Sequence, residues 1–311
     1  MTKGRCAVPQ LVLAVGLAGA LAPALSAQTG PTPDYVVPSY VDFRITTRMS
    51  HGDGPTHTTT TTLYLRGARE RRESAVEQKG EPATPLPASI LQCDQRRAIH
   101  LNLNAQLFSE VAFVEWSNSF AGVSTLPEAQ GPVVTTIEDA VDTGERRRLG
   151  RHVARRVKTT TVVSPAPGAN TPASRRETEG WYIDLPGLGC VASEMKSSLR
   201  VSAENPNGPR DRHRYQTKGT ARRGYAIEET TRHTEARMTY TTTVTLVDWS
   251  DAPLDPLLFE TPANFRPALR MPGGGVDLTK PDSVANRLQT YWDVLTAVVS
   301  RVVPWSRDRL R

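Results

Sequence analysis

The sequence is poor in cysteine, in aromatic residues and in long apolar runs. It has three cysteines in 311 residues, and aromatic residues make up 6% of the chain. Binding of single-stranded nucleic acid needs aromatic side chains interleaved with basic ones, so we expect no nucleic-acid partner. The formal net charge of +6 is spread among acidic residues rather than gathered in blocks, which is typical of a solvated surface. Beyond residue 27 no segment is apolar enough over a sufficient length to predict a membrane helix.

The sequence also lacks the motifs of common enzyme and metal sites. It contains no HExxH, no GxSxG and no phosphate-cradling glycine loop, and its histidines never stand four residues apart on a helix. His51 and His57 flank a turn and could meet across it as a weak metal site, although exposed turn residues are the simpler interpretation. We therefore predict no catalytic residue, no cofactor, no metal and no enzyme activity.

Residues 1–27 have the plan of a secretory signal peptide. Lys3 and Arg5 precede the apolar run Leu11–Leu21, and small residues lead to a cleavage point after Ser26 or Ala27. An uncleaved anchor helix is the alternative. We expect export to the periplasm or cell envelope, followed by a disordered, proline-rich lead over 28–38.

Two of the three cysteines remain after export. Cys6 lies before the apolar run and leaves with the signal peptide, so a lipid-anchored form is not expected. In an oxidising compartment Cys93 and Cys190 would usually pair as a disulfide, and two separately buried thiols are the alternative. A zinc site is disfavoured because no His or Cys stands at ligand spacing beside either residue.

Most of the exported chain alternates between apolar and polar residues with the period of a β-strand. Tyr40–Ile45 and Arg97–Leu103 show this alternation clearly, and runs of threonine such as Thr58–Thr62 suit exposed strands. Further strands are expected at 70–76, 89–94, 107–116, 133–137, 145–149, 152–163, 181–185, 224–231 and 237–248, and a short helical turn is expected within 254–265. The pattern predicts a mainly antiparallel β protein with a first β lobe over 39–130 and a second over 131–268, or one long sheet. The segments 165–174 and 192–213 are expected to be linker and loop.

The C-terminal part has a different period. After a glycine-rich linker over 269–280, residues 281–303 place apolar side chains at helical spacing between Pro281 and Pro304, and a basic tail follows over 304–311. The apolar stripe comprises Val284, Leu288, Tyr291, Leu295, Val298 and Val302, widened by Trp292, Val299 and Trp305. Such a helix either docks on the sheet or binds a membrane surface or a partner, and the sequence leaves both open.

The triplet Asp-Thr-Gly, which carries the catalytic carboxylate of aspartic proteases, occurs in this chain at Asp142-Thr143-Gly144. Those enzymes need two carboxylates that share one proton, and this chain has a single DTG followed by Glu145 and three arginines. An aspartic-type hydrolase that uses Asp142, with a second chain supplying the other carboxylate, is therefore a distant alternative. We expect the triplet to form a tight hairpin turn with Gly144 at a positive φ.

Several strings recur in the same order in a group of exported bacterial proteins of unknown function. They are TTTTLYLRGARERRE, SILQCDQRRAIHLN, VDTGERRRLGRHVARRVKTTT, GWYIDLPGLGC and LDPLLFETPANF, and they cover roughly Tyr40 to Phe265. The sheet pattern of that group resembles the half-barrel of the periplasmic lipoprotein-carrier (LolA/LolB-like) proteins, in which a curved antiparallel sheet encloses an apolar cavity. The two motif cysteines match Cys93 and Cys190, which supports the disulfide.

The resemblance implies a curved, half-barrel-like sheet that binds a lipid or a lipidated protein on its concave face. We take this as the first hypothesis: a non-enzymatic exported protein with an apolar ligand. The alternative is an envelope scaffold or interaction module that acts through its C-terminal amphipathic helix. The resemblance does not extend to this helix or to the many arginines.

Overall fold

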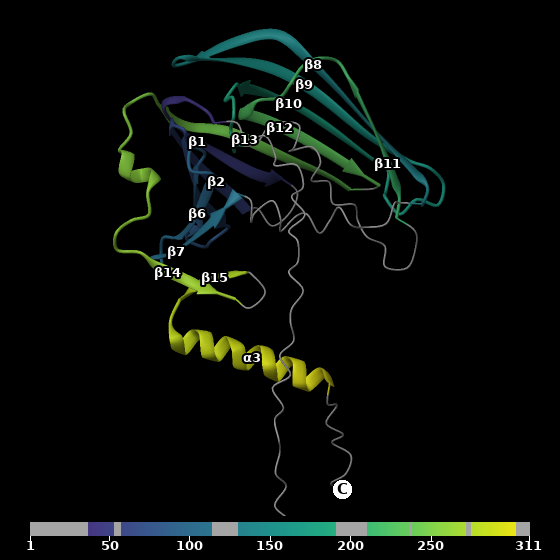
Figure 1. Cartoon of the computed structure of the whole chain (residues 1–311). Coiled ribbons are helices and arrows are strands. Elements are labelled where there is room, and N and C mark those ends of the chain that lie inside the picture. The colour runs from purple at the N-terminus through teal and green to yellow at the C-terminus, as the bar shows by residue number, and fades with distance from the viewer. Residues whose placement is uncertain are drawn as a thin grey trace, which may run out of the picture. The chain divides into compact units, whose positions relative to one another are not determined.

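The computed structural model (Figure 1) describes residues 37–52, 57–113, 130–190, 210–236, 238–271 and 275–302. The chain divides into two units, residues 1–32 and residues 33–311, and all described residues belong to the second. The expected signal peptide, most of the lead and the basic tail lie outside the described residues.

Nearly all of the described secondary structure is β-strand. The strands are β1 (Tyr40–Gly52), β2 (His57–Gly67), β3 (Arg69–Gln78), β4 (Thr84–Pro85), β5 (Ala88–Gln92), β6 (Arg97–Asn102), β7 (Leu107–Ala112), β8 (Val133–Leu149), β9 (His152–Pro165), β10 (Ser174–Ile183), β11 (Arg212–Lys218), β12 (Tyr225–Glu235), β13 (Met238–Ser250), β14 (Arg266–Arg270) and β15 (Val276–Pro281). The helical elements among the described residues are the 3₁₀ turn η2 (Pro256–Phe259) and the helix α3 (Val284–Val302).

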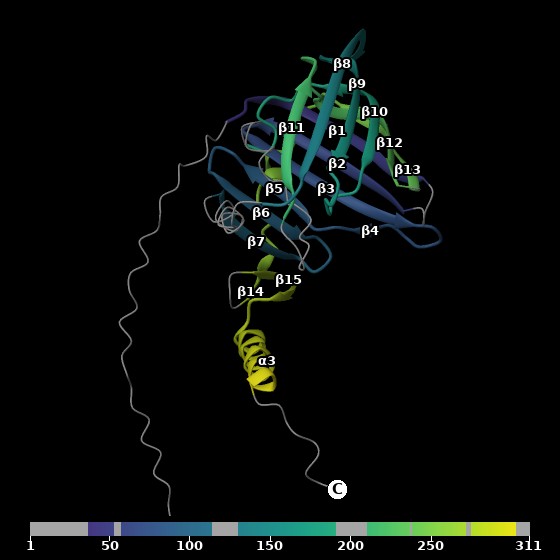
Figure 2. The same ribbon diagram turned by 90° about the vertical axis from the view of Figure 1, so that its right-hand side faces the viewer.

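The strands form one large curved sheet that does not close (Figures 1 and 2). Its order is β11-β8-β9-β10-β12-β13-β1-β2-β3-β5-β6-β7-β14-β15, and β4 pairs with β3. Neighbours are antiparallel except at two places, where β11 runs parallel to β8 and β14 runs parallel to β7. The prediction of a mainly β protein with a curved sheet and a C-terminal helix is confirmed.

Strand β1 joins the early and late parts of the chain. It pairs with β2 on one side and with β13 on the other, where Arg44 stands opposite Ser250 and Gly52 opposite Thr241. Of the two arrangements that the sequence allows, two lobes or one long sheet, the structure has one continuous sheet.

Several described segments form strands that the sequence does not predict. The expected loop 192–213 overlaps the start of β11 (Arg212–Lys218), and all seven residues of this strand are exposed. Its side chains therefore show no alternation of apolar and polar residues to detect. Strand β10 begins at Ser174 rather than at Trp181, and the expected linker 269–280 contains part of β14 and most of β15.

The expectation of a hairpin turn at Asp142-Thr143-Gly144 is wrong. Strand β8 runs through the triplet, and the turn to β9 lies at Gly150 and Arg151. Asp142 pairs with Val157 and Arg146 with Arg155, so the intervening residues of β8 form a β-bulge opposite a single residue of β9. Gly144 does have the expected positive φ, of 82°, which a bulge can accommodate as well as a turn.

Apolar side chains of the sheet form three buried clusters, whose members are at most 6% exposed. The first joins β1 and β2 to the ends of β8, β9, β10 and β12, and comprises Phe43, Ile45, Leu63, Leu65, Leu149, Ala154, Ile183 and Ile227. In the second, Phe259 of η2 covers β5 and β6, which confirms the short helical turn expected within 254–265. The third cluster surrounds Cys93 and Cys190.

Helix α3 follows β15 after two residues, Asp282 and Ser283. Ser283 Oγ accepts a hydrogen bond from the backbone N–H of Asn286 at 3.2 Å, as an N-terminal capping residue does. Within the described residues, no helix combines the length and the apolar character that crossing a membrane requires.

Candidate functional site

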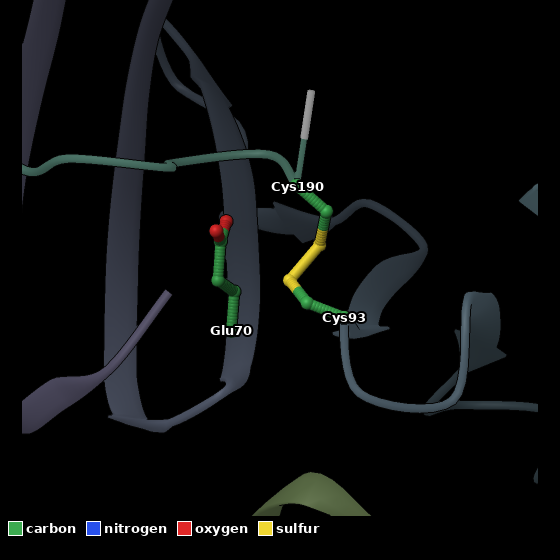
Figure 3. Close-up of side chains that lie close together, drawn as sticks. All are labelled: Glu70, Cys93 and Cys190. Atoms are coloured by element: carbon green, nitrogen blue, oxygen red, sulfur yellow. A yellow bond between two sulfur atoms is a disulfide. The ribbon is translucent and has the colours of Figure 1, made fainter. Parts of the chain in front are cut away.

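Cys93 and Cys190 lie at disulfide distance (Figure 3). Cys93 follows β5, Cys190 ends the segment after β10, and their Cα atoms are 5.4 Å apart across a sequence separation of 97 residues. Both side chains are at most 1% exposed. The structure thus brings the two predicted cysteines together rather than burying them separately, and the pair indicates an oxidising compartment.

A buried carboxylate lies beside this pair. Glu70 of β3 is 3% exposed, and its Oε1 accepts hydrogen bonds from the Tyr40 hydroxyl at 2.8 Å and from the Gly189 backbone N–H at 2.6 Å. Burial, together with the charge of Glu70, raises the pKa of the Tyr40 hydroxyl far above its ordinary value. Glu70 therefore ties the segment that carries Cys190 to β3 and β1.

Glu70, Cys93 and Cys190 also form a possible metal-ligand group, because one ligand atom of each lies within 4.8 Å of the others. Sulfur atoms joined in a disulfide are not thiolates, and thiolates are the form that binds metals. In the disulfide-bonded state the cluster is therefore structural. Nothing in the sequence pattern marks Glu70, because its burial follows from the strand pairing that sets it opposite Leu65.

The carboxylate of Asp142 is committed to an ion pair. Its two oxygens accept hydrogen bonds from Arg146 at 2.8 and 2.9 Å, and Oδ1 also accepts from the backbone N–H of Gly144. Arg146, with a smaller contribution from Gly144, lowers the pKa of Asp142. An aspartic protease needs one carboxyl group that holds a proton, and this environment favours the ionised form. The hydrolase alternative gains no support from the geometry at Asp142.

His51 and His57 meet as the sequence suggested, with ring centroids 4.5 Å apart. His51 Nδ1 also lies 3.1 Å from the Thr242 hydroxyl. Among the described residues, these two rings belong to no group of three metal-ligating side chains at ligand distances. Two histidines alone leave most of a metal ion's coordination sites unfilled.

Two hollows stand out among the described residues. The larger, of about 750 Å³, lies over β9, β10, β12 and β13 and is lined mostly by charged and hydroxyl-bearing side chains. This lining differs from the apolar one that the resemblance to lipoprotein carriers implies. Many apolar side chains of the sheet are packed into the three buried clusters, whereas others on the strands, such as Val153 and Val247, are exposed.

Helix α3 exposes its apolar face. Five apolar side chains on it are 42–72% exposed: Val284, Leu288, Tyr291, Trp292 and Val294. The one buried side chain described on the helix is polar, since Thr290 is 7% exposed, and Asn286 one turn earlier is half-buried. The apolar stripe that the sequence predicts is therefore present, but its described part is not packed on the sheet.

Contacts near its first turn hold α3 to the rest of the fold. Asn286 Nδ2 donates a hydrogen bond to the Pro281 carbonyl at 2.8 Å, and Arg287 forms an ion pair with Asp282. The backbone N–H of Asp282 bonds to the carbonyl of Pro267 in β14. Arg287 lowers the pKa of Asp282, so this ion pair persists to moderately acidic pH. The attachment fixes where α3 starts and leaves the described part of its apolar face uncovered.

A scan against the known protein families finds no match for the chain, and a search of curated proteins finds none either.

Proposed function

We propose that the protein is a non-enzymatic protein of the periplasm or cell envelope that attaches to an anionic membrane surface through α3. The observation that carries this proposal is the orientation of the helix: Leu288 and Trp292 are 64% and 65% exposed, whereas Thr290 is buried. If the helix docked on its own sheet, Leu288 and Trp292 would be buried and Thr290 would be exposed.

The composition of α3 suits the boundary between lipid headgroups and acyl chains. Tyr291 and Trp292 have amphipathic rings, which favour that boundary, and they lie beside aliphatic side chains on the same face. The 19 residues of the helix extend over about 28 Å, so the helix can lie along a surface over several turns.

Charge favours an anionic surface. Arg287 lies in the first turn of α3, and the sequence toward the C-terminus adds Arg301, Arg307, Arg309 and Arg311. Each basic residue close to an anionic membrane contributes about 1 kcal/mol of attraction, which falls with added salt. Apolar burial and charge thus act together on the same end of the chain.

The location rests on two independent features. The N-terminal 27 residues have the pattern of a signal peptide, and the Cys93–Cys190 pair is stable in an oxidising compartment. Both fit the periplasm or the outer envelope.

Co-flotation with lipid vesicles tests the attachment. The mature chain should float with vesicles of phosphatidylglycerol and phosphatidylethanolamine, float less with pure phosphatidylcholine, and lose binding when Leu288→Glu and Trp292→Glu are combined. The matched control combines Gln289→Glu and Thr296→Glu, which add the same charge to the polar face of the same helix. Equal flotation of the two double variants, or no flotation of the unmodified chain, would refute the proposal and leave a protein partner as the occupant of this face.

The apolar-ligand function implied by the resemblance stays a separate prediction. Native mass spectrometry of the protein purified from its host envelope would show co-purifying lipid if that function holds. Removing residues 282–311 should leave such lipid in place, because a ligand in the sheet does not depend on α3. The two functions can therefore be told apart.

A further inference from the structure

The larger hollow is built from side chains that stand in register on four neighbouring strands. Across β9, β10 and β12 the rows read Arg156–Trp181–Glu228, Lys158–Glu179–Thr230 and Thr160–Glu177–Arg232. Thr243 of β13 continues the second row, because it pairs with Thr230. Directly opposed residues of antiparallel strands point to the same face, so these side chains form one continuous lining.

The charges in this lining are largely neutralised within the protein. Arg156 Nη1 contacts both carboxylate oxygens of Glu145 at 3.0 and 2.9 Å, and Lys158 Nζ lies 3.4 Å from Glu179. Glu228 accepts a hydrogen bond from Arg147 at 3.0 Å, outside the three rows. An ionic ligand would have to break such pairs, whereas a neutral ligand can hydrogen-bond to them as they stand.

Unused hydrogen-bonding capacity remains in the lining. Arg232 is exposed and forms no ion pair with any of the described residues, and Thr230 is exposed beside it. Thr160 adds a hydroxyl group that can both donate and accept a hydrogen bond, and Thr245, whose hydroxyl donates to the Arg48 carbonyl, can still accept one. A ligand rich in hydroxyl groups matches this mixture of donors and acceptors better than a ligand with one type of polar atom.

An aromatic ring completes the lining. Trp181 is half-buried, and the guanidinium carbon of Arg147 lies 5.0 Å from its ring centroid. Arg147, which is held by Glu228, covers one face of the indole, and Trp181 also packs against the first buried cluster, so the part of the ring that stays exposed lines the hollow. Sugar rings combine an apolar face of C–H groups with hydroxyl groups around the edge, and that face packs well against an aromatic ring.

We propose that this hollow binds a neutral oligosaccharide, such as a short segment of a surface glycan. Its volume of about 750 Å³ lies in the range of pockets that hold small ligands. The proposal is independent of membrane attachment, because none of the lining residues belongs to α3.

Isothermal titration calorimetry of the mature chain with maltotetraose, cellotetraose and chitotetraose tests the proposal. We expect saturable binding of at least one tetrasaccharide, weakened roughly tenfold by Trp181→Ala. Thr230→Val keeps the volume and the branched Cβ of threonine, and should weaken binding about two- to tenfold through the loss of one hydrogen bond. Because this second variant preserves the strand, a folding defect in the first would not obscure the result.

Two controls lie outside the hollow. Thr239→Val makes the same substitution in the same hairpin, and Trp249→Ala removes an exposed tryptophan from β13; both should bind like the unmodified chain. Absence of binding to all three sugars at millimolar concentration would overturn the proposal, as would binding that neither hollow variant weakens. Binding of hexaglutamate or hexalysine in preference to the sugars would show an ionic site instead.

Discussion

The sheet and the C-terminal helix use apolar residues in opposite ways. In the sheet, apolar side chains such as Ile90 and Ile99 are fully buried between neighbouring strands and η2. On α3, apolar side chains of similar size, such as Leu288, remain mostly exposed. The two regions have equally regular patterns, with period two in the strands and a period near 3.6 in the helix.

This contrast shows that an amphipathic pattern specifies a face but not what covers it. In the buried clusters of the sheet, apolar side chains pack against other parts of the fold, although some apolar side chains elsewhere in the sheet, such as Val247, are exposed. Helix α3, attached near one end, lacks such packing on the described part of its apolar face, which is available to something outside the chain. The free energy of unfolding should therefore depend mainly on the sheet, and attachment to a membrane should depend on α3.

Removing the disulfide should have the largest effect on stability. Replacing Cys93 and Cys190 together by serine frees a loop of 97 residues in the unfolded chain, which should lower the free energy of unfolding by about 4–5 kcal/mol. Urea denaturation of the variant and the unmodified chain measures this difference. Adding a reducing agent should destabilise only the unmodified chain, and equal sensitivity of both proteins would show that the bond does not contribute.

Truncation of one apolar side chain in each region compares sheet and helix directly. Ile99→Ala leaves a cavity in a fully buried cluster, and should cost about 2–5 kcal/mol of unfolding free energy. Leu288→Ala should change it by less than about 0.5 kcal/mol, because that side chain is exposed. Similar losses at both positions, measured by urea denaturation, would show that α3 is packed after all.

Tyr40→Phe tests the hydrogen bonds around Glu70. Without the Tyr40 hydroxyl, one of the partners of this buried carboxylate is lost, and we expect a loss of about 1–3 kcal/mol. Tyr64→Phe is the matched control, because the Tyr64 hydroxyl has no hydrogen bond with the described residues. Thermal unfolding of both variants measures the difference, and equal melting temperatures would contradict the role assigned to Glu70.

A smaller effect is expected from pH. Burial lowers the pKa of His100, because the folded protein disfavours the charged ring. The unfolded chain takes up a proton on this histidine near pH 6.5, roughly its ordinary pKa. Stability from this group is therefore complete above that pH and falls as the pH decreases toward the folded pKa. His100→Gln should flatten this part of the stability curve, and an unchanged slope would exclude His100 as its source.

The smallest effect is expected at Asp142. Asp142→Asn removes an exposed carboxylate that is paired with Arg146, and it should leave vesicle binding and sugar binding unchanged. A peptide-cleavage assay of the unmodified chain should give no turnover. Proteolytic activity that disappears in the variant would restore the hydrolase alternative.

The strands of the fold could be predicted from the sequence where their two faces differ. Tyr40–Ile45 and Arg97–Leu103 alternate because one side chain in two is buried, and β1 and β6 follow these segments. Strand β11 could not be found in this way, because it lies at the edge of the sheet with both faces exposed. A glycine at positive φ suits both a tight turn and a β-bulge, so the sequence of the DTG segment does not separate them, whereas the register with β9 does.

For the candidate sites, too, some features could be predicted from the sequence and others depend on strand pairing. Proximity of Cys93 to Cys190 could be predicted, because two cysteines in a chain that is expected to be exported have few other partners. The lining of the hollow could not, since Arg156, Trp181 and Glu228 come together through pairing of strands far apart in the sequence. The pattern of α3 was visible in the sequence, but its exposure depends on the attachment at Asp282 and Asn286.

The pairing of β1 with β13 has a consequence for when the protein can fold. These strands are adjacent in the middle of the sheet, yet Arg44 and Ser250 are separated by most of the chain. Contacts of such long range form slowly, because a long loop must close first. We therefore expect one edge of β1 to lack its partner strand until β13 has been synthesised. During this time the chain would remain incompletely folded, which is the state in which a chain can pass through a secretion channel.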